Sequence, residues 1–386
     1  MTADATRSTS SLRDPRADIC RGLALWMIVI NHTPGNWLGD LTLKNFALCD
    51  ATEAFVLLAG YAAAFAYAGR ADRSGWAVAA ANVVQRVGKL YVAHIFLMVV
   101  FTAQVGYSAA ALDRRAYLDE LALDPFAEQP YRTLLEALLL RFQPAFLDIL
   151  PLYIVLLVLL LPGLALRARP WLLLSLSAAL WFAVRWTDFN LPRWQGGGWF
   201  FNPLAWQLLF FIGFLLGQGA RGAPSLPRPR RTGWLTGAAL LVLGAGLFAM
   251  ISVEWVPSLG ERLPEAIPAF LATVDKTDLH PARLASVLAI TYLVAHYVPR
   301  DTAALGGGWT RPLLAMGRNS LPVFCFGILL SFLGRLMLEF DDRWPMQLAV
   351  NVLGFGLLAM VGYLADWQRK GTPPPRSNLP APAPAG

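Results

Sequence analysis

Arg21 and His32 are the first residues of this sequence whose types and spacing suggest chemistry. They stand eleven positions apart, at the two ends of an apolar run. In an α-helix, which turns by about 100° per residue, the two side chains share one face and lie roughly 16 Å apart along the axis. A guanidinium and an imidazole are both costly in lipid, so their presence in an apolar helix indicates a functional site.

The composition of the chain is that of a membrane protein. Of its 386 residues, 56% are hydrophobic and 15% are charged, whereas a soluble domain is about half apolar and a quarter charged. The apolar residues come in blocks of about twenty, which is long enough to cross a bilayer. We therefore predict an all-α, polytopic membrane protein with a bundle of about ten transmembrane helices.

The expected spans are Asp18–Trp37, Ala47–Ala68, Leu90–Tyr107, Phe146–Leu166, Trp171–Trp186, Pro203–Ala220, Trp234–Val253, Ala282–Val298, Leu313–Leu336 and Met346–Trp367, and Tyr131–Phe142 is expected to be an additional helix too short to cross. Lys and Arg gather before the first span and in alternate connections, whereas the other connections hold most of the acids. By the positive-inside rule both termini are cytoplasmic. The expected domains are a cytoplasmic tail over 1–17, a transmembrane domain over 18–367 and a disordered cytoplasmic tail over 368–386.

Two carboxylates are expected near His32. Asp50 and Glu53 stand three positions apart at the start of the second span, so they share one face at the depth of His32. A carboxylate beside an imidazole can orient it and raise its basicity, as in general-base catalysis. We assign His32, Glu53 and Asp50 as candidate catalytic residues. The alternative is a structural polar network that joins the two helices.

Basic side chains are expected to meet at the cytoplasmic ends of the helices. Arg86 and Lys89 begin the third span and Arg318 begins the ninth, on the same side of the membrane as Arg21. Such a cluster can hold phosphates. The alternative is positive-inside anchoring by snorkelled side chains.

Outer segments hold candidates for binding a substrate. Trp199, Asn202, Trp206 and Gln207 follow a run of three glycines. Rings and amides of this kind can form a sugar-stacking platform, and an interfacial tryptophan belt is the alternative. Asp148, at the outer end of the fourth span, is a further candidate that also fits a helix N-cap. No two His residues have metal-ligand spacing, so we predict no metal site.

Several runs of the sequence resemble the acyltransferase type 3 superfamily and, within it, the OpgC family. The resembling runs are Arg21-x10-His32, Arg13–Leu25, Asn31–Gly35, Ala51–Phe55, Leu90–His94, Asp148–Tyr153, Gly198–Gln207 and Gly317–Pro322, in order along most of the chain. The chain departs from the superfamily at Arg86 and Lys89, where many members have Arg-x-x-Arg. Lysine keeps the charge there but loses the bidentate fork.

The resemblance implies a helical bundle with an internal tunnel, entered from the cytoplasm by an acyl-coenzyme A. OpgC proteins are succinyltransferases of periplasmic osmoregulated glucans, so we expect a membrane O-succinyltransferase of the bacterial inner membrane with His32 as general base. No permanently bound cofactor is expected, and succinyl-coenzyme A is the expected co-substrate. The bilayer and the glucan are the expected partners, without nucleic acid.

The acyl group and the alternative functions stay open at this point. A succinyl group brings its own carboxylate, for which Arg141 and Lys44 are the candidate cations. Succinyl and acetyl transfer both fit the residues, as do direct transfer and an acyl-histidine intermediate. The alternative function is a transporter or exporter of a glycan or an organic anion. We find no convincing internal repeat, which favours the enzyme.

Overall fold

The structure, a computed structural model, describes residues 14–227, 229–300 and 307–371. Over these ranges it is all-α, and an isolated bridge between Pro192 and Gly198 is the one strand-like pairing that they contain. The predicted disorder of the C-terminal tail falls almost wholly outside the described residues, as does most of the N-terminal tail.

Each of the ten expected spans overlaps a helix of the structure. These helices are α1 (Pro15–Asn31), α2 (Ala51–Ala63), α4 (Trp76–Ala111), α8 (Ile149–Ala165), α9 (Pro170–Thr187), α10 (Pro203–Ala220), α11 (Gly233–Met250), α14 (Pro281–Tyr297), α16 (Ser320–Phe340) and α17 (Trp344–Gly371). The shorter elements are η2 (Trp37–Leu41), η3 (Leu43–Asn45), η4 (Ala64–Ala68), α3 (Gly69–Ser74), α5 (Ala116–Glu120), α6 (Asp124–Glu128), α7 (Pro130–Leu138), η5 (Ile251–Trp255), α12 (Pro257–Gly260), α13 (Ala266–Ala272) and α15 (Arg311–Arg318).

Six helical stretches in the described chain are long and apolar enough to cross a membrane. They are α2 continued through η4 and α3, then α4, α10, α11 continued into η5, α16 and α17. The chain is therefore a multi-pass membrane protein. Helices α1, α8 and α14 have 17 residues each and α9 has 18, so a total of ten crossings stays a prediction.

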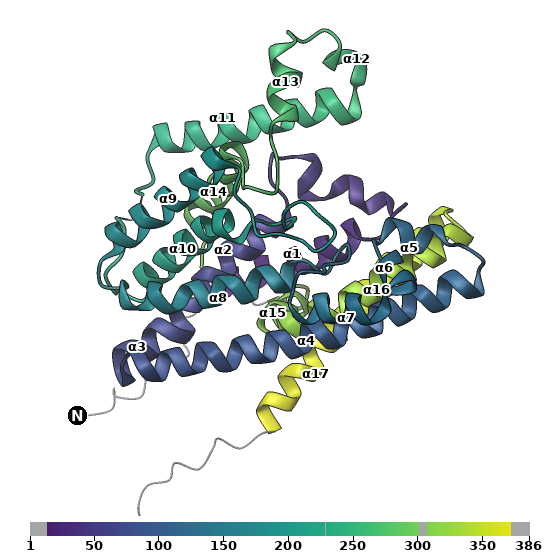
Figure 1. Ribbon diagram of the computed structural model, residues 1–386. Helices are drawn as coiled ribbons and strands as arrows, with labels where there is room; N and C mark the ends of the chain where they lie inside the picture. The colour runs from purple at the N-terminus through teal and green to yellow at the C-terminus, as the bar shows by residue number, and fades with distance from the viewer. Residues whose placement is uncertain (1–13, 228, 301–306, 372–386) are drawn as a thin grey trace, which may run out of the picture.

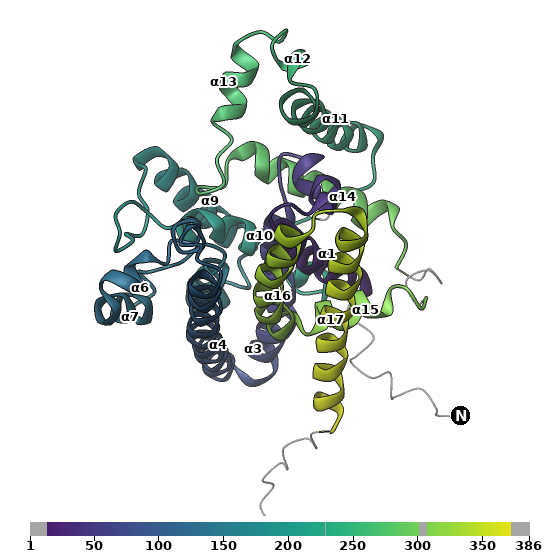
Figure 2. The same ribbon diagram turned by 90° about the vertical axis from the view of Figure 1, so that its right-hand side faces the viewer.

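Helices α4, α8, α10 and α11 run roughly parallel across Figure 1. Helix α10 packs against α2, α8 and α9, and α1 packs against α2, α15 and α16. Helices α11 to α13 form the projecting upper end in both views, and Figure 2 shows α16 and α17 side by side. The core thus forms around α1, α2 and α10, which are enclosed by the other helices.

Helices α2 and α10 meet backbone to backbone. A Cβ atom on Gly60 would lie 1.9 Å from the carbonyl oxygen of Phe210, and one on Gly213 would lie 2.0 Å from that of Leu57. Small residues allow such close approach between helices in a membrane. The glycines therefore fix the distance between α10 and the helix that carries Glu53.

The same device joins α1 to α15. A Cβ atom on Gly22 would lie 2.1 Å from the carbonyl oxygen of Leu313, and one on Gly317 would lie 1.9 Å from that of Asp18. The contact brings the Arg318 end of α15 against the Arg21 end of α1.

The expected span Leu313–Leu336 is wrong as a single helix, because the structure breaks it at Asn319. The ring of Pro322 would clash with the carbonyl of the residue four positions earlier in a continuous helix. The side-chain amide of Asn319 holds the break, donating to the carbonyl of Gly362 at 2.9 Å and to Asp366 Oδ1 at 2.8 Å.

Three other boundaries also differ from expectation. The second helix starts at Ala51, because Asp50 occupies its N-cap. The short helix expected over Tyr131–Phe142 ends at Leu138. Helix α4 has 36 residues and extends well before Leu90, so it is about 54 Å long.

Substitution of Gly60 by alanine tests the close contact between α2 and α10. We expect Gly60→Ala to lower the stability of the full chain by about 1–3 kcal/mol or more, because the added methyl overlaps a backbone carbonyl. The matched control is Gly88→Ala in α4, where a Cβ atom meets nothing within 4 Å. Thermal unfolding in detergent measures both, and equal midpoints for the two variants would contradict the packing.

Candidate active site

A cavity of about 410 Å³ lies beside His32. The ends of α1, α2 and α8, the first turns of α16 and four connecting segments form its wall. Its lining residues are Ile28, His32, Thr52, Ala122, Gln143, Ala145, Phe146, Asp148, Ile149, Arg193, Phe200, Phe201, Lys276 and Phe324. Four ionisable side chains thus share one space, namely those of His32, Asp148, Arg193 and Lys276.

His32 caps the C-terminus of α1 and its ring is held in one orientation. Nδ1 lies 2.6 Å from the carbonyl oxygen of Ile28, one turn earlier. A carbonyl oxygen only accepts, so Nδ1 carries the hydrogen and the lone pair of the neutral ring is on Nε2. The ring also packs edge to face on Phe146, with centroids 4.3 Å apart. The imidazole is therefore fixed with its basic nitrogen left for another group.

Asp50 and Glu53 form a capping box at the start of α2. Asp50 Oδ1 accepts from the backbone N–H of Thr52 at 2.7 Å, and Glu53 Oε2 accepts from that of Asp50 at 2.9 Å. Two cations complete the group: Lys276 Nζ lies 2.5 Å from Asp50 Oδ2, and Arg283 Nε lies 2.7 Å from Glu53 Oε1. Glu53 is fully buried. The box therefore ties α2 to α14 and to the segment before it.

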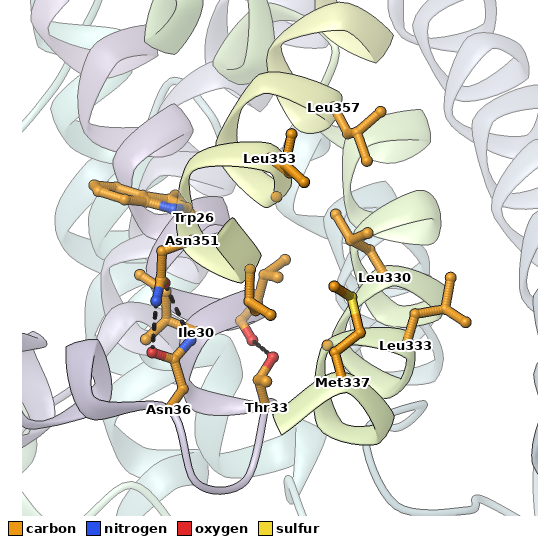
Figure 3. Close-up of a pocket in the computed structure, with 14 residues that line it drawn as sticks. Trp26, Ile30, Thr33, Asn36, Leu330, Leu333, Met337, Asn351, Leu353 and Leu357 are labelled. Carbon is orange, nitrogen blue, oxygen red and sulfur yellow. Dashed lines mark hydrogen bonds between the residues drawn. The ribbon is translucent and has the colours of Figure 1, made fainter. Parts of the chain in front are cut away.

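A second hollow, of about 200 Å³, lies between α1, α16 and α17 (Figure 3). Asn36 and Asn351 close one end by exchanging hydrogen bonds of 3.1 and 2.9 Å. The other lining side chains are apolar except that of Thr33, which donates to the carbonyl of Val29. None of the lining residues is ionisable, so this hollow offers no acid or base and the cavity at His32 is the candidate active site.

The family model described as OpgC protein matches residues 13–370, nearly the whole chain. The chain belongs to the OpgC family. This confirms the predicted family and the predicted enzyme class, a succinyltransferase of osmoregulated glucans. Searches of curated proteins and of solved structures found no match.

The structure of this OpgC-family chain gives the predicted catalytic carboxylates other partners than His32. No hydrogen bond joins His32 to Asp50 or Glu53 in the described residues, and the carbonyl of Ile28 orients the ring instead. Sequence reasoning missed Lys276 and Arg283, which lie 226 and 230 positions from their partners. The only indication of these two cations in the sequence was that Asp50 and Glu53, as acids at the start of a membrane span, need cations nearby.

Arg21 and Arg318, two of the predicted phosphate ligands, meet at Asp18. Arg21 is buried and donates to the carbonyl oxygen of Leu58 at 2.6 Å. Its Nη1 lies 3.5 Å from Asp18, and Nε of the more exposed Arg318 lies 3.7 Å from the same carboxylate. Arg21 thus links α1 to α2 in this structure.

Arg86 and Lys89, the other two predicted phosphate ligands, lie about three turns inside α4, because this helix begins at Trp76 and not near Leu90. Arg86 is half-buried and Lys89 is exposed. Neither makes a side-chain hydrogen bond or an ion pair with another described residue, so the structure leaves both cations free.

The predicted sugar platform is buried and does not line the cavity. Asn202 donates to Asp278 Oδ1 at 2.7 Å, and Trp206 Nε1 donates to the carbonyl of Lys276 at 3.0 Å. Gln207 bonds to Ser177, and Trp199 is also buried. Burial raises the pKa of Asp278, although the bond from Asn202 opposes the rise. Asn202 and Trp206 thus hold the Lys276 segment against α10, and Gln207 joins α10 to α9. Phe200 and Phe201 line the cavity instead.

Asp148 is the predicted substrate ligand that does line the cavity. It occupies the N-cap position of α8, but its side chain makes no capping bond. The two predicted cations for a succinyl carboxylate do not line the cavity. Arg141 pairs with Glu136 at 3.3 Å, and Lys44 is exposed. No three His, Cys, Asp or Glu side chains of the described chain gather as a metal site would require.

Removal of Arg283 tests the buried ion pair. We expect Arg283→Gln to cost about 3–5 kcal/mol of stability, because it leaves the buried carboxylate of Glu53 without its cation. Adding Glu53→Gln restores part of the loss, since the double variant buries no unpaired charge. The control is Arg343→Gln, whose pair with Asp341 is exposed. Thermal unfolding of the four proteins decides, and an Arg283→Gln variant as stable as the control would contradict the pairing.

Proposed function

We propose that this chain transfers a succinyl group from succinyl-coenzyme A to a hydroxyl of an osmoregulated glucan, with His32 as general base. The observation that carries the proposal is the state of the His32 ring. Its Nδ1 is bound to the Ile28 carbonyl and its Nε2 is left beside a cavity of about 410 Å³. A base within hydrogen-bond reach of a hydroxyl is what acyl transfer from a thioester requires.

One histidine is sufficient for both proton transfers of the reaction. Nε2 of His32 takes the proton of the sugar hydroxyl as its oxygen attacks the thioester carbonyl carbon. The C–O bond forms, the C–S bond breaks, and the imidazolium returns the proton to the leaving thiolate. The Nδ1–H bond to Ile28 keeps the ring in the same tautomer throughout. We propose direct transfer, since the base needs no covalent intermediate to complete this sequence.

The acceptor sugar is assigned to the side of the cavity that holds Asp148. Its carboxylate makes no capping bond and can accept from sugar hydroxyls, and the rings of Phe200 and Phe201 offer apolar faces in the same wall. The buried Asn202 and Trp206 act on the sugar only through the Lys276 segment that they position, and Trp199 and Gln207 are assigned a structural role.

The acyl donor is proposed to enter at the other end of α1. Arg86, Lys89 and Arg318 supply cations for its phosphates, while Arg21 anchors the helix. Phe324, in the second turn of α16, lines the same cavity as His32, so the cavity extends inward from the imidazole. By the distribution of Lys and Arg, we place both termini in the cytoplasm and the chain in a bacterial inner membrane.

Replacing His32 tests the base. We expect His32→Ala to reduce the succinyl content of periplasmic glucans about 100-fold or more, because a general base typically contributes 10²–10⁴ in rate. The control is His296→Ala, which removes the histidine near the end of α14 that bonds to the carbonyls of Tyr292 and Pro229. Mass spectrometry of the glucans measures the added succinyl mass.

An unchanged succinyl load in a well-expressed His32→Ala strain would reject His32 as the base. If the glucans of the His32→Ala strain kept their succinyl content but accumulated in a different compartment, that result would instead favour a transporter.

Replacing the two free cations of α4 tests the donor end. We expect Arg86→Ala with Lys89→Ala to weaken binding of succinyl-coenzyme A about 10-fold or more, because two charge-assisted contacts to phosphate are lost. The control is Arg230→Ala with Arg231→Ala, which removes two exposed bases from the segment before α11. Binding to the full chain in detergent is measured by calorimetry, and equal affinity of the two double variants would reject the assignment.

A further inference from the structure

We propose that Arg193 binds the terminal carboxylate of the acyl group and so selects a dicarboxylic donor. The inference rests on the proposed acyl transfer at His32 and names the residue that distinguishes succinyl from uncharged acyl groups. Arg193 lies in the segment between α9 and α10 and lines the same cavity as His32. Neither Arg141 nor Lys44 does so.

The cavity wall contains two permanent cations, and among the described residues only Lys276 has a carboxylate partner within 4 Å. Lys276 Nζ is 2.5 Å from Asp50 Oδ2 and lies over the ring of Phe201. Its charge is therefore offset by a partner that the fold already provides. Arg193 has no carboxylate oxygen within 4 Å among the described residues. The guanidinium of Arg193 is thus the cation in the wall that is available to an entering anion.

The guanidinium of Arg193 has unused hydrogen-bond donors. Nη2 donates to the carbonyl oxygen of Gln143 at 3.0 Å, whereas the buried Nε has no acceptor in the described structure. Burying a donor without a partner is unfavourable. A carboxylate beside the guanidinium would accept from it in the planar, two-pronged geometry that arginine offers.

The run of three glycines fixes the backbone of Arg193. Its N–H donates to the carbonyl of Gly197 at 3.1 Å, and the N–H of Gly196 donates back to the carbonyl of Arg193 at 3.3 Å. Gly196 and Gly197 have φ angles of 94° and 69°, which residues other than glycine rarely adopt. At Gly198 an added Cβ would lie 2.4 Å from the side chain of Asn190. The glycines thus form a tight turn that holds Arg193 at the cavity.

Asp148 has a charge opposite to that of Arg193, so the acyl group and the sugar are expected to bind to different side chains of the cavity. A succinyl carboxylate is repelled by Asp148 and attracted by Arg193, whereas sugar hydroxyls can donate to Asp148. A site built to bond a polar group discriminates strongly against an analogue that lacks it, because its own polar atoms are then left unpaired. Arg193 therefore disfavours an acetyl or butyryl donor.

The test compares succinyl- and butyryl-coenzyme A, whose acyl groups have four carbons each and differ in the terminal carboxylate. We expect Arg193→Gln in the full chain to lower kcat/KM with succinyl-coenzyme A about 10- to 100-fold and to leave that with butyryl-coenzyme A within about twofold. Arg193→Lys should recover part of the succinyl activity, since it keeps the charge without the fork. The control is Arg141→Gln, an arginine outside the cavity wall.

A second measurement does not depend on catalysis. Monomethyl succinate should raise the thermal midpoint of the wild-type chain in detergent, whereas methyl butyrate should not, and Arg193→Gln should abolish the difference. Equal losses with both donors, or an unchanged response to monomethyl succinate in Arg193→Gln, would overturn the inference. A wild type that binds monomethyl succinate through Arg193 but transfers no acyl group would overturn the proposed function and leave the carboxylate site standing.

Discussion

The pairing of buried charges at the start of α2 is the constraint on which the cavity depends. In a low-dielectric interior a carboxylate without a cation is severely destabilising. Asp50 and Glu53 therefore draw Lys276 and Arg283 to the same point. That attraction fixes the beginning of α14 and the segment before it against α2, and the same segment supplies one wall of the space beside His32.

Helix α1 connects the anchored Arg21 end of the bundle to the end that carries His32. Its Arg21 end is held by the carbonyl of Leu58 and by the glycine contact with α15. Because the helix is rigid, this anchoring also sets the position of His32. Only the ring orientation is left to local bonding, and the Ile28 carbonyl provides it. Of the two aligned residues, Arg21 thus has a structural role as the anchor of α1, and His32 has the proposed chemical role.

The sequence predicted the helices better than the contacts between them. Hydropathy located ten spans that each overlap a helix of the structure, and the helical spacing of Arg21 and His32 led to the residue that lines the cavity. The break at Asn319 was missed because apolar residues stand on both sides of the short polar run Arg318–Ser320, which was included in one span. Arg193, Lys276 and Arg283 were missed for another reason. Their partners are set by packing between distant segments, and helical periodicity relates only residues within a few turns.

The separation of Arg21 and His32 along α1 has an electrical consequence on the proposed polarity. On that polarity a succinyl group enters from the cytoplasm as its thioester with one negative charge and ends on the periplasmic sugar with the same charge. The hydroxyl proton leaves with the thiol of coenzyme A on the cytoplasmic side, so each transfer would move one elementary charge across the bilayer. A membrane potential that is negative inside favours this direction by about 2.3 kcal/mol per 100 mV. Transfer of an uncharged acyl group along the same helix would gain nothing from that potential.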